Sequence, residues 1–286
     1  MRRLADWLFW SEGSTRSVAL LRVALVLLCW SRWGGDLLLY KASDAAELAI
    51  SVSFYASTAL LLAGFLTPLA GAWTAATLVA IFAFLGVVRG VEAYVHHHVF
   101  LLVAASVLLA LTPCGRSLSV DRWLALRRSR ADGHPPPPER GPLHGQRLLA
   151  MLVSSVYLFA TWDKLTPGFL SGERLQHVLL DRYGTSAPPS IPGFETLCLL
   201  GALGTVAMEA TLGIGLWVPR IQRPLLVAGA LFHGMLFVVL PVGPFSATMV
   251  ALYLAFLDPA AVHRAVGRLL GDAPPPAAAD DNAMSA

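Results

Sequence analysis

Charged side chains are scarce in this sequence. Lysine, arginine, aspartate and glutamate make up 14% of its 286 residues, whereas soluble domains carry about a quarter. Apolar residues make up 56%, and the mean hydropathy is +0.63. So few charges could not cover the surface of a water-soluble domain of this size, and the composition therefore argues for a membrane protein.

Cysteine is scarce too, and it lacks the spacing of a functional motif. Cys29, Cys114 and Cys198 are the only cysteines, and no two of them are close in sequence. An odd number without a CxxC pair excludes a disulfide framework and a CxxC redox site. We therefore expect three structural thiols, which behave as small apolar side chains.

Metal-ligand motifs and nucleic-acid-binding patterns are also missing. The three consecutive histidines at positions 96–98 would point about 100° apart on a helix, and neither HxxxH nor HExxH accompanies them. No basic face carries interleaved aromatic residues. We expect no metal site and no nucleic-acid partner.

The sequence does contain a series of apolar runs near twenty residues long, which match the roughly 30 Å hydrocarbon core of a bilayer. The runs are continuous rather than alternating, which favours helices over a β-barrel. The sequence predicts an all-α fold, a polytopic transmembrane helical bundle of about eight spans. We place these spans at residues 17–33, 47–66, 69–88, 96–113, 147–163, 196–218, 223–240 and 244–258.

The distribution of lysine and arginine predicts the orientation of these spans. With both termini on the cytoplasmic side, fourteen of the 21 cations fall in cytoplasmic segments and six in external ones, while Arg22 lies inside the first span. Cytoplasmic loops of membrane proteins carry an excess of cations. We therefore expect both termini to be cytoplasmic, in a multi-pass protein of the inner or plasma membrane.

Two segments differ in composition from the rest of the transmembrane domain, which we place at residues 1–260. Residues 114–146 form a basic cytoplasmic loop, in which residues 116–130 can fold as an amphipathic helix on the membrane surface before the prolines 135–138 interrupt it. Residues 261–286, with three consecutive prolines followed by alanine and aspartate, are expected to be a disordered cytoplasmic tail.

Few polar side chains lie at membrane depth, where an unpaired polar group is costly. Arg22 falls about a third of the way along the first span, and Glu209 lies near the middle of the sixth. The two could form a buried ion pair, which would either clamp two helices or line the floor of a cavity. His233, in the seventh span, either bonds to a neighbouring helix or belongs to a site.

Lys164 ends the fifth span beside Asp163. It is either an anchor that extends to the membrane interface or a partly desolvated general base. Tyr157 lies seven residues earlier and therefore on the same helix face. We expect one outward-facing cavity lined by Lys164, His233, Tyr157 and one of His96, His97 and His98.

The segment that ends in Gly172 resembles a family signature. Its pattern is similar to Y-F-x-A-G-x-x-K-L-x-x-x-W-x-x-G, the signature of the transmembrane superfamily of vitamin K-dependent gamma-glutamyl carboxylases, also called HTTM proteins. Thr161 and Phe169 replace the glycine and the tryptophan of that pattern. The matching residues are Tyr157, Ala160, Lys164, Leu165 and Gly172. Further blocks follow in the family's order, at Arg22, the histidines 96–98, residues 119–121, Glu209 and residues 232–233.

This resemblance implies a chemistry for the site. In the carboxylases, the lysine that matches Lys164 deprotonates vitamin K hydroquinone, and the histidine that matches His233 assists. The resemblance therefore implies a lipid hydroquinone of the vitamin K or menaquinol type as cofactor, with Lys164 and His233 as catalytic residues. The carboxylases also carry a large extramembrane C-terminal domain that helps bind their peptide substrate. No such segment follows the last expected span, so we expect a short, bacterial-type member.

Three classes of function stay open. The protein could be a quinol-linked oxidoreductase or carboxylase-like enzyme that acts among membrane lipids on a secreted peptide or protein. It could be a non-catalytic accessory for maturation or export of a secreted peptide, like the sporulation-delaying protein B family. It could also be a transporter or a structural membrane protein.

Overall fold

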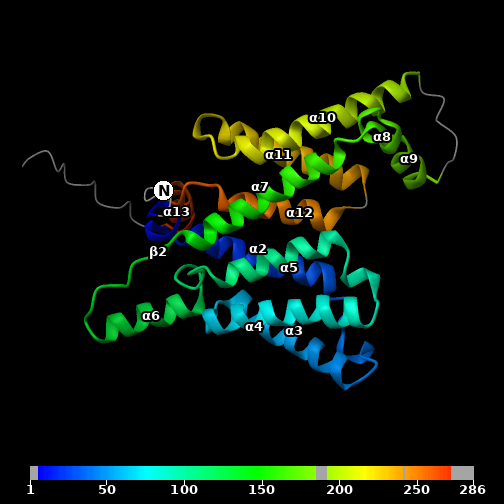
Figure 1. Ribbon diagram of the computed structural model, residues 1–286. Coiled ribbons are helices and arrows are strands. Elements are labelled where there is room, and N and C mark those ends of the chain that lie inside the picture. The colour runs from blue at the N-terminus through cyan, green and yellow to red at the C-terminus, as the bar shows by residue number, and fades with distance from the viewer. Residues whose placement is uncertain (1–5, 185–191, 241, 272–286) are drawn as a thin grey trace, which may run out of the picture.

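The computed structural model describes residues 6–184, 192–240 and 242–271 (Figure 1). Within these ranges nearly all regular structure is helical, which confirms the all-α prediction. The exception is a short antiparallel ribbon, in which β1 (Glu12–Ser14) pairs with β2 (Arg140–Pro142) and Gly13 lies opposite Gly141.

A helix occupies each range in which the sequence predicts a span. These long helices are α2 (Arg16–Trp33), α3 (Ala45–Ala63), α4 (Thr67–Ala80) continued by the π-helix η3 (Ile81–Val88), α5 (His97–Ala110), α7 (His144–Lys164), α10 (Phe194–Gly215), α11 (Pro219–Val239) and α12 (Gly243–Leu252). The shorter helices are η1 (Asp6–Trp10), η2 (Leu39–Lys41), η4 (Glu92–Tyr94), α6 (Val120–Ala131), α8 (Pro167–Leu170), α9 (Glu173–Arg182), η5 (Tyr253–Ala255) and α13 (Pro259–Leu270).

Length and composition identify the helices that can cross a membrane. Among the described residues there are four of them, namely α3, α4 with η3, α10 and α11. A fifth results if α12 with η5 and α13, which are bent by 101° at their junction, count as one broken span. The fold is therefore that of a helical membrane protein.

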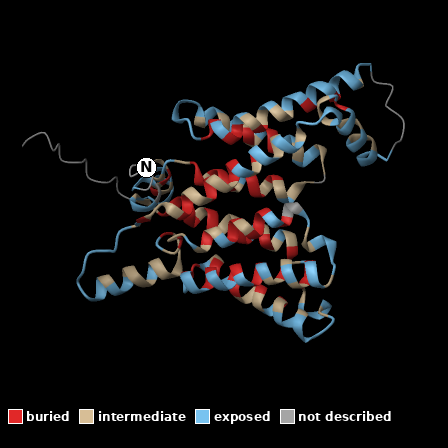
Figure 2. Ribbon diagram, viewed as in Figure 1, coloured by how far each residue is buried: buried red, intermediate tan, exposed pale blue. Residues whose placement is uncertain are grey.

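The long helices lie side by side and run between two ends of the molecule (Figure 1). β2, α6, α13 and the N-terminal segment gather at one end, and α8 and α9 lie at the other. Buried residues concentrate in the central helices, whereas the flanking helices are exposed along much of their length (Figure 2). Large apolar side chains such as Leu231 and Val238 are 70% and 76% exposed on a flanking helix, as expected for a surface that faces lipid.

The loop helix and the tail differ from the sequence predictions at their boundaries. The expected amphipathic helix is present as α6, but it begins only after Leu118, whose φ of 49° is not helical. Ser119 caps it by accepting a hydrogen bond from the backbone N–H of Arg122 at 2.9 Å. The prediction of disorder from residue 261 onward is wrong for residues 261–270. They belong to α13, which Asp258 caps by accepting a bond from Ala261 N at 3.0 Å. The tail prediction for 272–286 falls outside the described residues.

All three cysteines are buried and unpaired, which agrees with the expected structural thiols.

Candidate functional site

A cavity of about 670 Å³ lies between α7, α9, α10 and α11, with contributions from α5 and α12. Its volume is in the range of ordinary small-molecule sites. Phe159 on its wall is 74% exposed and Phe100 is 57% exposed, so the cavity borders the lipid-facing surface. Most of the lining is apolar and consists of Phe100, Leu101, Leu152, Val156, Phe159, Ala160, Phe169, Leu175, Val178, Leu236, Leu240, Val242 and Phe245.

The polar part of this cavity includes an ion pair between two helices, besides Ser155, Asp163, Arg174 and Thr205. Lys164 Nζ lies 3.0 Å from Oε2 and 3.1 Å from Oε1 of Glu209. Glu209 is 7% exposed and sits in the interior of α10. Lys164 also donates to the Ala160 carbonyl at 3.2 Å, and its ammonium lies 5.8 Å from the centre of the Phe169 ring. The pair therefore places two opposite charges in a mostly apolar space, which the charged residues Asp163 and Arg174 also line.

Local sequence explains why Lys164 ends its helix at this point. Pro167 begins α8, and the residue before a proline avoids the helical conformation, so Thr166 is extended and α7 stops. A cation in the last turn is favoured by the helix dipole. Gly172, the last residue of the signature, has a φ of 83° and lies against α10, where an added Cβ would be 2.5 Å from the Leu199 nitrogen. The signature thus holds α8 and α9 against α10, beside the cavity.

A second, buried cluster lies next to the cavity. The Tyr157 hydroxyl is 2.7 Å from His233 Nε2 and 2.5 Å from the Tyr253 hydroxyl, so it joins three helices. His233 is 1% exposed, and its Nδ1 has no hydrogen-bond partner within the described part of the chain. Phe245, which lines the cavity, lies against the His233 ring at a centroid distance of 5.9 Å. Phe245 therefore contacts both the histidine and the cavity, which His233 itself does not line.

Tyr253 is a member of this cluster that the sequence analysis missed. It can reach Tyr157 only because α11 has a glycine at position 229, where an added Cβ would lie 2.1 Å from the Tyr253 oxygen. An isolated glycine inside an apolar helix often marks such a close approach. That glycine was the only signal in the sequence for this contact.

The structure places the expected site residues in several locations. Lys164 and Glu209 line the cavity, while Tyr157 and His233 lie behind it and do not line it. His96 lines a separate pocket of about 380 Å³ together with Arg32 and Pro244. The side chains of His97 and His98 lie outside the described residues. In the described ranges, no three His, Cys, Asp or Glu side chains form a group that could hold a metal.

The expected ion pair between Arg22 and Glu209 is wrong. Arg22 is fully buried but donates to the carbonyl oxygens of Cys114 at 2.6 Å and Leu118 at 2.5 Å. These carbonyls follow the end of α5, where the chain has left the helical hydrogen-bond pattern and its oxygens need donors. Glu209 pairs with Lys164 instead, so Arg22 holds a loop at the end of the bundle and takes no part in the cavity.

These features define an integral membrane protein with a polar site inside an apolar helical bundle. The family model described as the HTTM domain matches residues 37–260, which include every element of the cavity and of the buried cluster. The chain belongs to the HTTM family. No curated protein and no solved structure matches it.

Proposed function

We propose that the cavity binds a lipid hydroquinone of the vitamin K or menaquinol type, with its aliphatic chain along the apolar wall and its polar head at Lys164 and Glu209. The observation that carries this proposal is the ion pair at the edge of a cavity that borders lipid. An amphiphile that arrives from the bilayer fits such a site, because both its parts find matching surroundings.

We further propose that the pair acts in proton transfer, the role that the family resemblance assigns to Lys164. The paired lysine carries its proton as an ammonium group, so it becomes a base only after Nζ passes a proton to the Glu209 carboxylate, 3.0 Å away. The neutral amine can then accept a proton from a ligand hydroxyl. When bound, the hydroquinone supplies that hydroxyl and its reducing equivalents. His233 does not line the cavity, so it can assist only if lining side chains such as Phe245, which lies against its ring, move.

The proposal is tested by measuring binding of a short-chain 1,4-naphthohydroquinone to the purified protein under reducing conditions. Lys164→Met and Glu209→Gln should each weaken binding by about tenfold, the effect of losing roughly 1.4 kcal/mol of polar contact. Lys41→Met is the matched control, because Lys41 lies in η2 outside the cavity. Unchanged binding and unchanged hydroquinone consumption in Lys164→Met would contradict the proposal.

For the arrangement in the membrane we propose eight spans with both termini on the cytoplasmic side of the cell membrane. The arginine-rich α6 and α13 lie at the same end of the bundle as the N-terminal segment, whereas α8 and α9 lie at the opposite end, beside the cavity (Figure 1). The positive-inside rule places the arginine-rich end in the cytoplasm. A secreted peptide or protein as substrate stays a prediction.

A further inference from the structure

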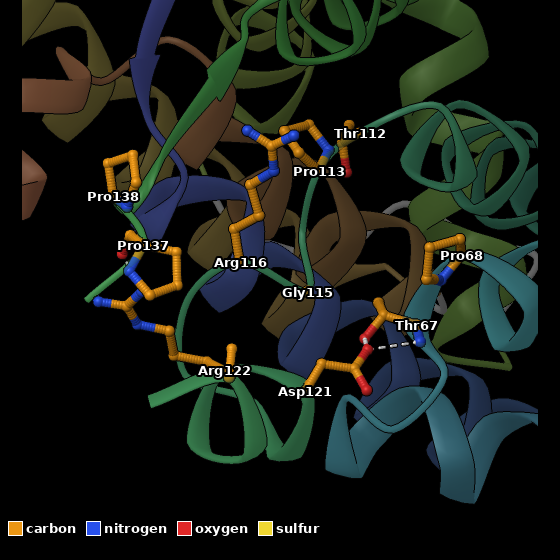
Figure 3. A pocket seen from close by; sticks show the side chains of 11 residues that line it. Thr67, Pro68, Thr112, Pro113, Gly115, Arg116, Asp121, Arg122, Pro137 and Pro138 are labelled. Atoms are coloured by element: carbon orange, nitrogen blue, oxygen red, sulfur yellow. Dashed lines mark hydrogen bonds between the residues drawn. The ribbon is translucent and has the colours of Figure 1, made fainter. Parts of the chain in front are cut away.

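A second cavity lies at the end of the bundle that carries α6. It has a volume of about 540 Å³ and lies between the start of α4, the segment after α5, the first turns of α6 and the segment before β2 (Figure 3). It is lined by Thr67, Pro68, Thr112, Pro113, Gly115, Arg116, Asp121, Arg122, Ala125, Pro137 and Pro138. None of the residues proposed for the hydroquinone site is among them.

The position of this cavity along the bundle corresponds to the headgroup layer of a membrane. Thr67 is the first residue of α4, which with η3 is long and apolar enough to cross the bilayer. Thr112 and Pro113 follow directly after the apolar helix α5 on the opposite side of the cavity. The place where apolar helices begin and end is the place where lipid headgroups lie.

The charged groups in the cavity favour an anion. Asp121 is its only acidic lining residue within the described chain, and both carboxylate oxygens accept bonds from the start of α4. Oδ1 binds Leu66 N at 2.9 Å, and Oδ2 binds Thr67 N at 2.8 Å and Thr67 Oγ1 at 2.6 Å. Figure 3 shows this carboxylate turned toward Thr67 and away from Arg116 and Arg122. The negative charge is thus already bound by donors of the protein.

The two arginines keep donors that these contacts do not use. Arg116 is exposed, and its one side-chain hydrogen bond among the described residues runs from one guanidinium nitrogen to the Arg140 carbonyl at 2.6 Å. Arg122 donates to the Pro137 carbonyl, and its Nε lies 3.4 Å from Glu139. Glu139 is shared with Arg16, whose Nε is 2.6 Å from it. The cavity and its surroundings therefore carry an excess of positive charge.

The backbone around the cavity is restrained. Four prolines limit the backbone freedom of three of the segments that line the cavity. Arg22 binds the carbonyls of Cys114 and Leu118, on either side of Arg116, and so fixes the loop that carries it. Side chains held in position bind a ligand with a smaller loss of conformational entropy.

The outer part of α6 carries further cations outside the cavity. Arg127, Arg128 and Arg130 follow on this helix, and the exposed Trp123 packs beneath Arg127, with the guanidinium 5.6 Å from the ring centre. Tryptophan beside basic residues is typical of segments that lie at the interface of an anionic membrane.

We propose that this cavity binds the phosphate of an anionic phospholipid, with Arg116 and Arg122 as its ligands and α6 lying in the headgroup layer. The lipid would link α4, α5 and the loop before β2, and so stabilise the end of the bundle opposite α8 and α9. The site is independent of the hydroquinone proposal.

The test uses the full-length protein in phosphatidylcholine nanodiscs that contain increasing amounts of phosphatidylglycerol. Retained lipid is counted by native mass spectrometry, and the unfolding temperature is recorded in parallel. Wild-type protein should retain phosphatidylglycerol in preference to phosphatidylcholine and unfold at a higher temperature in its presence. Arg116→Gln should reduce this preference about fivefold, the effect expected for one cation at a membrane surface. Arg130→Gln is the matched control, on the same helix but outside the cavity, and should keep most of the preference.

A second variant leaves every arginine in place. Ala125→Phe fills the cavity from α6, and it should abolish the preference for phosphatidylglycerol while the protein still unfolds cooperatively. Equal retention of the two lipids by wild-type protein would overturn the proposal, as would full preference in Ala125→Phe. Soluble glycerol phosphate serves as a third arm. If it stabilises the protein as strongly as the lipid does, the site binds a free phosphate compound, and the assignment to a lipid is wrong.

Discussion

The ammonium group of Lys164 and the carboxylate of Glu209 meet across the interface of α7 and α10, 3.0 Å apart, in a cavity whose lining is mostly apolar. Each charge is the only charged group that the other contacts within the described residues. Removing either partner leaves a charge in surroundings that solvate it poorly.

We therefore expect non-additive effects from this pair on stability. Lys164→Met and Glu209→Gln should each lower the free energy of unfolding by roughly 2–5 kcal/mol, toward the lower end because Lys164 is partly exposed. The double variant should lose clearly less than the sum of the two, since no charge is left unpaired. Tryptophan fluorescence during thermal unfolding in detergent measures this. If the loss in the double variant equals the sum of the two single losses, the interaction between Lys164 and Glu209 does not itself stabilise the protein.

The buried cluster depends on the absence of a side chain at position 229. Gly229→Ala should destabilise the protein by about 1–3 kcal/mol, the usual effect of overpacking, because the new methyl group would collide with the Tyr253 hydroxyl 2.1 Å away. Adding Tyr253→Phe should restore part of that loss by removing the oxygen. Gly234→Ala, on the same helix with nothing within 4 Å of an added Cβ, is the control and should have little effect.

The prediction of cytoplasmic termini can be tested with single cysteines. The three native cysteines are buried, at 1% or 2% exposure, and should give little background labelling. In intact cells, an impermeant maleimide should label Tyr183→Cys at the end of α9 and should leave His134→Cys, after α6, unlabelled until the cells are opened. The reverse pattern would invert the proposed orientation.

The partly exposed ion pair between Asp44 and Arg89 gives a prediction for pH. The pKa of Asp44 lies below its ordinary value of 3.8, chiefly because the carboxylate accepts the backbone N–H of Glu47, and also because Arg89 donates to it. A lowered pKa means that the carboxylate stabilises the fold above pH 3.8 and loses this effect as the pH falls through the lower folded value. Wild-type protein should therefore unfold at a higher temperature than Asp44→Asn near neutral pH, and the difference should shrink below about pH 3.8. A constant difference would show that the charge is not responsible.

Sequence reasoning found the polar residues of the bundle but not all of their partners. The cost of a charge in lipid predicts that Arg22 and Glu209 face inward, and both are buried. It does not predict which group each one meets, because that depends on helix rotation and on the relative height of helices far apart in sequence. We predicted a carboxylate as the partner of Arg22, but its side chain binds two backbone carbonyl oxygens. Such carbonyls occur in every loop, so the pattern of side chains does not indicate which of them accept a bond.

Tyr253 and α13 show two further limits of prediction from the sequence. A tyrosine near the end of an apolar helix usually lies at the membrane interface, so nothing about Tyr253 itself indicated a bond to Tyr157. The helix α13 did have signals, since Asp258 is a good N-cap and Pro259 follows at the first helical position. We nevertheless predicted disorder for the whole tail, because the proline-rich segment after α13 dominates its composition.

The β1–β2 ribbon determines the order in which this protein can be completed. β1 precedes α2, and β2 follows α6, so the strand that leaves the ribosome first has no partner until α2, α3, α4 and α5 have all been synthesised. When β1 pairs with β2, the chain between them, which contains α2 to α6, is closed into a loop before α7 is synthesised. The last helix, α13, then packs against both β1 and α2. The N-terminal segment is thus made first and receives its last contacts from α13, and a chain that stops before residue 140 would carry α2, α3, α4 and α5 with an unpaired strand before them.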